Sequence, residues 1–561
     1  MRSLILTAMF SVGLLATCGK SAVSRSQYQF VAHQGEFAFN EGDNDVGLIW
    51  KKDGIGLVKK AFDNRITTND NILVMVSYGN QSQLDSFYMT GESILAEAKQ
   101  RNSPRGYLLF SLKDTKPLDH LALLAHGSQA FGCGHLEVID QTLDLSSARD
   151  EYQPTLYAEQ IPLDDVSAMQ ALVDTARIRT TMQSLEHQGT RFHNSDSGQA
   201  TPSLVADIFQ DADPSDHLSL AITFSDHALT PQKSVIAKIV GQNPELPHII
   251  VGSHLDSIHG NPGSNQEEAP GADDNASGVA VIAEVIRILS SANAQFSRTI
   301  EFHAYAAEEI GLVGSSNIAS SYRSKSQRVA MMMQLDMTSY SSDPNSETIY
   351  LVEDDTSPLP NASTARLIET YLGGDYSFGQ IGGGGTSDHR SWSIQGFQTV
   401  FPFENPQDFN PLLHTPDDTT ANANNLPLAG RFAKLVLAAL SHHAGLLGAQ
   451  SEYLNKLKAA NLSGDLAVAI VPGTSEDQVR WVVGSPKLVT DMELCQLNSQ
   501  NFCEQERVTL SAGGNRNDRS FHVTDVDMKL DHGSVWRVYG YDSAGRLSYL
   551  RDLRAVKSAT F

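Results

Sequence analysis

The chain has 561 residues, of which 41% are hydrophobic and 19% are charged, a composition typical of globular proteins and unlike that of disordered or fibrous ones. Because a single core rarely keeps growing beyond about 300 residues, this length predicts several domains. The 65 acidic and 41 basic residues give a net charge of −24, which repels phosphate backbones and argues against nucleic acid as a partner.

The N-terminus predicts a secretory signal peptide over residues 1–24. Arg2 is followed by an apolar stretch over residues 4–15, which is long enough for a signal peptide and short for a membrane span. A buried first helix fits this position less well. Two products remain open: a chain lipidated at Cys18, or a freely secreted chain cut near residues 22–24. We therefore expect a secreted or cell-envelope protein that touches a membrane only through a lipid on Cys18.

Residues 25–150 mix short strand-like and helix-like stretches and contain no chemical motif. Residues 28–31 and 72–76 read as strands, whereas residues 91–99 favour a helix. The sequence therefore predicts an N-terminal α+β region. A polar connector over residues 146–165 leads out of it.

The two later regions have different patterns. Residues 166–448 alternate strands with amphipathic helices, which predicts an α/β fold with a mostly parallel mixed sheet flanked by helices. Residues 449–561 contain short strands, at 466–471, 479–483 and 535–539, separated by Gly, Asp and Asn turns. This second pattern is typical of a small β-sandwich.

Residues suited to metal binding or acid–base chemistry occur only in the middle region. Three predicted strands end in such residues: His254 and Asp256 follow the strand 248–252, Glu308 and Glu309 follow the strand 299–306, and Asp336 follows the strand 329–335. Two loops carry the others. Asp274 lies in a glycine-flanked loop before the helix 278–290, and His414 lies in the loop after the strand 398–401. Ligands bind at the carboxyl ends of strands in open α/β sheets, so we expect these side chains to converge.

Each position also has a simpler explanation. A histidine after a strand is more often a hydrogen-bonded structural residue, and Asp274 could be only the cap of the next helix. Together, however, so many carboxylates at one edge would destabilise the fold without a counter-charge. Two imidazoles and three carboxylates suit a divalent metal such as zinc, and one bridging carboxylate would let them hold two ions.

These residues and their neighbours resemble the two-zinc exopeptidase family that includes secreted bacterial leucyl aminopeptidases. About half of the chain is covered, and the motifs are His254-Leu255-Asp256-Ser257, Ala269-Pro270-Gly271-Ala272-Asp273-Asp274, residues 305–312, Gln334-Leu335-Asp336-Met337-Thr338, Ser387-Asp388-His389, Pro402-Phe403-Glu404 and residues 410–415. The resemblance implies a zinc exopeptidase-like fold and two Zn2+ per chain.

The resemblance also implies a role for each residue. Asp274 would bridge the two ions, with Glu309 and His414 on one of them. His254 and Asp336 would hold the other. Glu308 would be the general base, and Asp256 would be the acid that orients His254.

The expected substrate pocket is apolar, and its predicted walls are Met337, Phe401, Phe403, Phe409 and Leu413. These residues could equally belong to an ordinary core. The chain departs from the leucyl enzymes at residues 382–386, where a glycine run replaces the expected cysteine and tyrosine. A preference for leucine therefore rests on the apolar residues alone.

The sequence thus predicts a secreted, monomeric metallo-aminopeptidase that hydrolyses the N-terminal peptide bond of peptides and prefers a hydrophobic, leucine-like first residue. The alternative is a zinc carboxypeptidase or another exopeptidase of the same superfamily, for which Arg390 could anchor a C-terminal carboxylate. Gly-x-Ser-x-Gly and His-Glu-x-x-His are absent, which argues against a serine hydrolase and a helix-based zinc protease.

By resemblance, residues 25–150 would be a propeptide or a permanent accessory domain, and residues 449–561 a fibronectin-like domain.

Overall fold

The computed structural model describes residues 71–126, 136–139 and 164–446, with the exception of 79, 100–104, 215, 261–265, 267 and 382–385. Within residues 28–60 and 468–554, it describes the strands alone. The predicted signal peptide, with Cys18, lies outside the described residues. Among the helices of this described part, none is both long and apolar enough to cross a bilayer.

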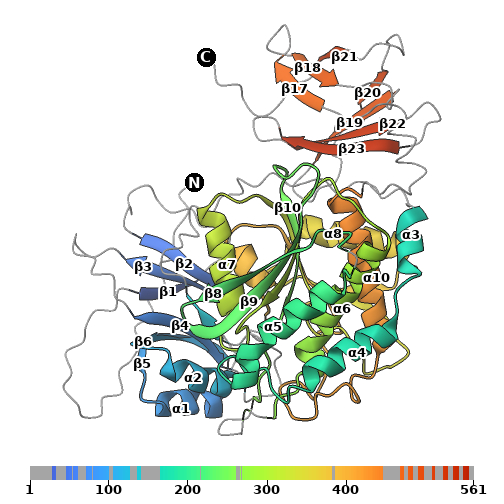
Figure 1. The fold of residues 1–561 in the computed structure, drawn as a ribbon. Helices are drawn as coiled ribbons and strands as arrows, with labels where there is room; N and C mark the ends of the chain where they lie inside the picture. The colour runs from blue at the N-terminus through green and yellow to red at the C-terminus, as the bar shows by residue number, and fades with distance from the viewer. Residues whose placement is uncertain are drawn as a thin grey trace, which may run out of the picture.

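A six-stranded mixed sheet lies at the centre of the molecule (Figure 1). Its strands are β8 (Ala221–His227), β9 (Thr230–Ile239), β10 (His248–His254), β11 (Ile300–Tyr305), β12 (Val329–Gln334) and β15 (Thr399–Val400), in the order β15–β12–β10–β11–β9–β8. The first four in this order are parallel, whereas β9 and β8 are antiparallel to their neighbours. The predicted mostly parallel mixed sheet is confirmed.

The three central strands end at one edge of this sheet. Nearly uninterrupted apolar residues form them, and every residue of β10, β11 and β12 is buried, as expected for strands covered on both faces. The register pairs His254 with Tyr305 across β10 and β11, and Gly252 with Gln334 across β10 and β12. The residues that follow the three strands therefore leave the sheet at nearly the same level.

Helices cover both faces of the sheet (Figure 1). The helices that share the larger apolar core with the sheet are α4 (Thr175–Glu186), α5 (Asp196–Asp211), α6 (Gly278–Ser291) and α10 (Leu426–His443). On the other face, α7 (Val313–Ser324) and α9 (His389–Ile394) pack through a cluster that includes Ile318 and Trp392. Two more helices, α3 (Asp164–Gln170) and α8 (Pro358–Tyr371), lie against α10.

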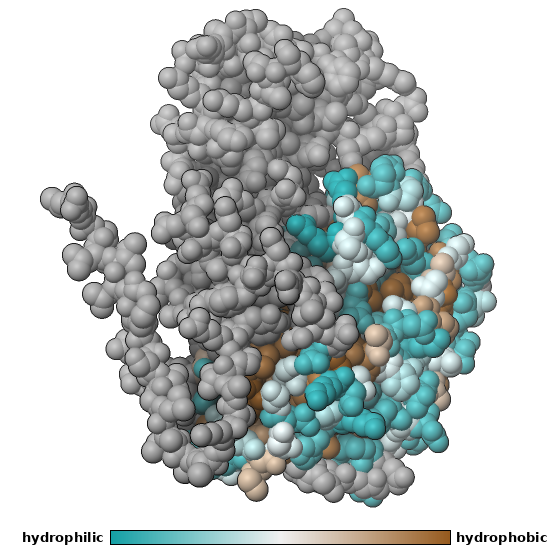
Figure 2. All heavy atoms as spheres, turned by 90° about the vertical axis from the view of Figure 1, so that its left-hand side faces the viewer, coloured by the Kyte–Doolittle hydropathy of each residue, from teal (hydrophilic) through white to brown (hydrophobic). Residues whose placement is uncertain are grey.

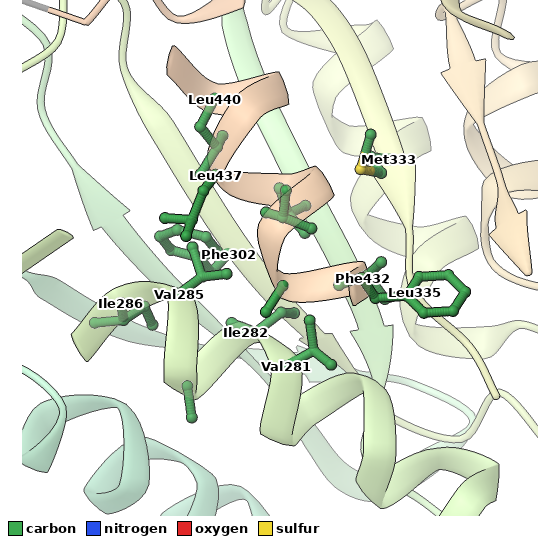
Figure 3. Packing of buried hydrophobic residues seen from close by; sticks show 14 of the residues in the cluster. Val281, Ile282, Val285, Ile286, Phe302, Met333, Leu335, Phe432, Leu437 and Leu440 are labelled. Carbon is green, nitrogen blue, oxygen red and sulfur yellow. The ribbon is translucent and has the colours of Figure 1, made fainter. Parts of the chain in front are cut away.

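Helix α6 is the helix predicted over residues 278–290, and it is buried on nearly all sides. Its residues Ile282 and Val285 belong to the same core as Phe302 of β11 and Phe432 of α10 (Figure 3). Because close packing holds α6 against the sheet and beside α10 and α4, the loop before its first residue is fixed at the sheet edge.

A second, three-stranded sheet lies beyond β12. It consists of β13 (Ile349–Val352), β14 (Tyr376–Gly379) and β16 (Pro402–Phe403), and β13 is central. The antiparallel register pairs Tyr350 with Phe403. This pairing fixes the segment that leads from β15 towards the loop of His414.

The N-terminal part has a βαββαβ connectivity. Its elements are β4 (Ile72–Tyr78), α1 (Gln81–Met89), β5 (Ser93–Lys99), β6 (Gly106–Leu112), α2 (Lys116–His126) and β7 (Leu136–Val138). The sheet order is β5–β6–β4–β7 with antiparallel pairing throughout, which is a ferredoxin-like arrangement. A separate antiparallel sheet contains β1 (Tyr28–Ala32), β2 (Val46–Lys52) and β3 (Ile55–Lys60).

The predicted helix over residues 91–99 is wrong, because β5 occupies this segment. Alanine, glutamate and lysine give it a high helix propensity, but propensity is a weak prior that tertiary pairing overrides. Strand β5 pairs with β6, and a register shift between Ile94 and Ala96 interrupts the pairing. This irregularity blurs the two-residue alternation by which a strand is recognised.

Seven C-terminal strands form two antiparallel sheets. One contains β17 (Val468–Pro472), β18 (Gln478–Val483) and β21 (His522–Asp527), and the other contains β19 (Asp491–Leu497), β20 (Val508–Ser511), β22 (Val535–Tyr541) and β23 (Leu547–Arg554). The predicted strands at 466–471, 479–483 and 535–539 are confirmed within two residues, whereas the packing of the two sheets into a β-sandwich stays a prediction. The boundaries assigned to the domains stay predictions.

Figure 2 views the molecule from the side on which the N-terminal domain lies. Hydrophilic residues cover most of the coloured surface, and hydrophobic residues lie mainly in the hollows between them. Among the described residues, the large exposed hydrophobic side chains are scattered, as Met89, Phe224 and Phe378 illustrate. Such single exposures are normal for globular proteins.

Candidate metal centre

The five residues predicted as metal ligands lie together at the edge where β10, β11 and β12 end. Nε2 of His254 lies 3.0 Å from Oδ1 of Asp274 and 3.3 Å from Oδ1 of Asp336. Nε2 of His414 lies 3.0 Å from Oδ2 of Asp274 and 3.2 Å from Oε2 of Glu309. Asp274 is thus central, with one oxygen facing each histidine. All five side chains are buried.

The residues present fit a pair of divalent cations. Nε2 of His254, Oδ1 of Asp336 and Oε2 of Glu309 are buried, and they face their neighbours at 3.0–3.3 Å without hydrogen-bond geometry. Buried polar atoms normally have partners, so a cluster of such atoms requires an explanation. Histidine nitrogens and carboxylate oxygens that converge on common points are the arrangement of ligands around a metal.

Two glycines allow the loop of Asp274 to lie close to its neighbours. Gly271 has a left-handed backbone (φ +50°), and a Cβ there would lie 2.3 Å from the main-chain oxygen of Asp274. A Cβ at Gly278 would lie 2.5 Å from the main-chain oxygen of Leu335. At both glycines, the atoms that a side chain would meet are main-chain atoms of the protein itself.

Asp418 anchors the same loop, and sequence reasoning did not assign it a role. Its carboxylate accepts hydrogen bonds from the main-chain N–H groups of Asp273 (3.0 Å) and Asp274 (3.1 Å). The signal available in the sequence was only its position in the His414 loop. Because its two bonds join segments that lie 144 and 145 residues apart, the role becomes evident only in three dimensions.

Asp256 supports both glutamates as well as the first histidine. Its Oδ1 lies 3.5 Å from Nδ1 of His254, as expected for the acid predicted to orient that ring. The same carboxylate accepts the main-chain N–H groups of Glu308 (3.0 Å) and Glu309 (3.2 Å). Ala307 before them has a left-handed backbone, with φ +53°. Asp256 therefore fixes the turn that follows β11.

Burial and like charges control the protonation of this cluster. Burial, with the nearby Asp274 carboxylate, raises the pKa of Glu309 to about 7, and burial raises the pKa of Glu308 well above its usual range. Burial lowers the pKa of His414, but Glu309 and Asp274 outweigh it and raise that pKa to about 10. Cations that bind here must displace these protons, so metal affinity should fall as the pH falls.

Arg191 joins the two loops that carry ligands, and no sequence pattern marked it. Its fully buried guanidinium donates to the main-chain oxygens of Leu255 (2.9 Å) and Gly271 (2.8 Å). Leu255 follows His254, and Gly271 precedes Asp274 by three residues. The role depends on carbonyl groups 64 and 80 residues away in the chain, which leave no local signature.

The Ser-Asp-His motif lies behind Asp336. Oγ of Ser387 donates a hydrogen bond of 2.6 Å to Oδ2 of Asp336. Gln334 in turn donates to Oγ of Ser387 (3.1 Å) and to Oδ2 of Asp388 (3.0 Å). These bonds fix the orientation of the Asp336 carboxylate. The glycine run over residues 382–385 lies outside the described residues.

The predicted pocket residues also lie together. Met337, Phe401, Phe403 and Leu413 form one buried apolar cluster with Val352, and partly buried Phe409 packs against it. Met337 and Leu413 directly neighbour the candidate ligands Asp336 and His414 in the chain. Contact of these side chains with a substrate stays a prediction.

Arg390 cannot serve the alternative function as predicted. The side chain is fully buried and forms ion pairs with Glu137 and Asp355, each at 2.8 Å. A carboxypeptidase needs a cation that a substrate carboxylate can reach. The alternative therefore loses the anchor that the sequence offered.

One histidine that sequence reasoning missed reaches the site from the N-terminal domain. Nε2 of His126, at the end of α2, lies 2.7 Å from the main-chain oxygen of Glu309 and 3.8 Å from its Oε2. The ring lies edge-on to His414, with 4.4 Å between centroids. Because His126 lies far along the chain from every motif, no local sequence pattern indicated its position.

Comparison with known proteins gives consistent matches. Residues 234–440 match the sequence profile described as Peptidase family M28. A probable leucine aminopeptidase of Arthroderma benhamiae is 38% identical over 212 residues, which cover 37% of this chain and 56% of that relative. A probable leucine aminopeptidase of Trichophyton verrucosum is 31% identical over 355 residues, which cover 62% of this chain and 94% of the relative.

A solved structure agrees with these matches. The crystal structure of the Legionella pneumophila LapA aminopeptidase superposes with a TM-score of 0.56 and 26% sequence identity. The match covers 67% of this chain and 98% of LapA. It therefore extends beyond residues 164–446, which make up only about half of the chain.

Replacing Asp256 tests the support of the centre. Asp256→Asn keeps the shape but removes the charge that holds His254 and the turn of Glu308 and Glu309. We expect zinc affinity, measured by competition with a chromogenic chelator, to fall by about 10–100-fold. Asp417→Asn, at an exposed position beside Asp418, is the matched control and should bind zinc normally. Equal zinc affinity in the two variants would contradict the role of Asp256.

Proposed function

Because this chain belongs to peptidase family M28 and is a metallo-aminopeptidase, we propose that it releases hydrophobic N-terminal residues, leucine above all, from peptides with two Zn2+ per chain. The observation that carries the proposal is the position of Asp274 between two sets of ligands. The names of the fungal relatives and the apolar cluster around Phe401 support the preference for leucine.

In the proposed centre, each ion has its own pair of side chains and shares Asp274. His254 and Asp336 would hold one ion, and Glu309 and His414 would hold the other. Bound ions would supply positive charge that polarises the scissile carbonyl and favours ionisation of the attacking water. Imidazole and carboxylate ligands suit zinc.

Glu308 is the proposed general base. Its side chain is buried, and neither carboxylate oxygen has a hydrogen-bond partner among the described residues. Burial raises its pKa, and two neighbouring cations would lower that pKa again. Glu308 would accept a proton from the attacking water and return it to the leaving amine.

The remaining features of the proposal concern the whole protein. We propose secretion or attachment to the cell envelope, a monomeric state, peptide or protein N-termini as substrates, no nucleic-acid partner, and membrane contact only through a lipid on Cys18. Residues 1–24 would be removed as a signal peptide. The N-terminal domain would be propeptide-like or a permanent accessory domain, and the predicted C-terminal sandwich would aid secretion, surface attachment or stability.

A panel of chromogenic substrates tests the reaction class. Aminoacyl-nitroanilides should release nitroaniline, fastest with leucine or another hydrophobic residue, because the substrate side chain would fill the apolar cluster. Peptides blocked at the N-terminus should remain intact, and no residue should be released from their C-terminus. Release of C-terminal residues from blocked peptides would favour the carboxypeptidase alternative.

The two adjacent glutamates should respond differently to the same substitution. Glu308→Gln cannot accept a proton, so kcat should fall by about 10²–10⁴ while zinc stays near two per chain. Glu309→Gln should lose affinity for one ion, and excess zinc should restore part of the activity. Metal analysis beside steady-state kinetics separates the two. Loss of zinc from Glu308→Gln would show that the roles are assigned wrongly.

N-terminal sequencing of the secreted protein tests processing. A propeptide-like domain should be cut off within the connector, so the mature chain should begin between residues 146 and 166. A start near residues 18–25 would instead show that the N-terminal domain is a permanent part of the enzyme.

A further inference from the structure

The N-terminal domain shares a core with the segment that carries the two glutamates. Apolar residues of β4, α1, β6, α2 and β7 form one cluster with residues of the central domain, namely Phe192, Ile258, Ala306, Ala307, Ile310 and Val313. Ala307 and Ile310 flank Glu308 and Glu309 directly in the chain, and Ala306 and Val313 lie within four residues of them. The N-terminal domain therefore packs on the turn at the centre of the proposed active site.

Polar contacts hold the same interface. Glu137 of β7 pairs with the buried Arg390 at 2.8 Å. Asp119 of α2 lies 2.9 Å from Nε2 of His193 and accepts a hydrogen bond of 2.6 Å from Asn194. Arg390 is the buried member of this ion pair. If the N-terminal domain moved away, the Arg390 guanidinium would lose one of its carboxylate partners in the interior. These contacts favour a docked domain over a loosely tethered one.

His126 is the residue by which this domain reaches the candidate ligands. Its ring is 4% exposed, and His126, Glu309 and His414 each offer a ligand atom within 4.8 Å of the others. Nε2 of His126 lies 3.8 Å from Oε2 of Glu309, which itself lies 3.2 Å from Nε2 of His414. Ligands of one zinc ion lie about 3–4 Å apart, because each is about 2.0–2.2 Å from the ion.

The position of His126 matters because catalytic and structural zinc sites differ. A catalytic ion has protein ligands and keeps one position open for water or substrate, whereas a structural ion is surrounded by protein. A further histidine on the ion of Glu309 and His414 would fill that open position. The burial of the Glu308 carboxylate, 1% exposed, agrees with a closed site.

We propose that the N-terminal domain keeps this site closed, and that His126 is the additional ligand that takes the open position of the metal held by Glu309 and His414. The proposal rests on the proposed aminopeptidase function and adds its regulation. The full chain is then a latent enzyme, and the site opens when α2 withdraws His126.

The same contacts allow a different role for His126, as a brace. Its Nε2 lies at hydrogen-bond distance from the main-chain oxygen of Glu309, so the ring could steady the active turn by donating to it. The two roles predict opposite effects on activity. Glutamine distinguishes them, because its amide can donate to that oxygen but is a poor zinc ligand.

The test uses the full chain with His126→Ala and His126→Gln, and with His120→Ala as the matched control, since His120 lies exposed on the same helix. Zinc-loaded proteins are mixed with a chromogenic chelator, and hydrolysis of leucyl-nitroanilide is measured in excess zinc. Both His126 variants should release one zinc faster, by at least the roughly 10–100-fold that loss of a supporting residue costs. Both should also hydrolyse the substrate faster than the wild type, and the control should match the wild type.

The outcomes separate this proposal from the proposed function. If His126→Gln behaves like the wild type, or if both His126 variants lose activity, His126 is a brace and the proposal is wrong. Unchanged zinc release in both variants would also overturn it. Faster zinc release with no hydrolysis of any aminoacyl substrate by any of the proteins would instead overturn the aminopeptidase function and leave the ligand assignment supported.

Discussion

Repulsion among buried carboxylates is the constraint on which the rest of this structure depends. Asp256, Asp274, Glu308, Glu309 and Asp336 lie buried at one edge of one sheet, where isolated charges are costly. The protein offsets these charges with the nearby guanidinium of Arg191, with main-chain N–H groups and with two histidines. Burial first, and the neighbouring carboxylates after it, still raise the pKa values of Glu308 and Glu309. Two divalent cations would complete the compensation.

The fold places these charges by simple means. Parallel strands buried on both faces end at the same level, so residues distant in the chain emerge side by side. Helix α6, packed on nearly all sides, fixes the loop of Asp274, and Gly278 lets the start of the helix lie close to Leu335, which follows β12. Asp418 and Arg191 then bind the loops to one another through main-chain groups. Rigid packing thus holds a charged site in a geometry that charge alone would not maintain.

The convergence of the five candidate ligands was predicted because three of them, His254, Glu309 and Asp336, stand at strand ends, where a chain pattern translates directly into a position in space. The mostly parallel sheet and α6 followed from apolar periodicity. Strand β5 was missed because its composition favours a helix and only pairing with β6 makes it a strand. Arg191, Asp418 and His126 were missed for another reason: each acts on groups more than 60 residues away, and no local pattern encodes such a contact.

The central claim is that two metal ions share Asp274, and anomalous diffraction from zinc-loaded crystals at the zinc absorption edge tests it most directly. We expect two peaks about 3.5–4 Å apart, one beside His254 and Asp336 and the other beside Glu309 and His414, with the Asp274 carboxylate between them. A single peak in the centre, or two peaks that do not share Asp274, would contradict it.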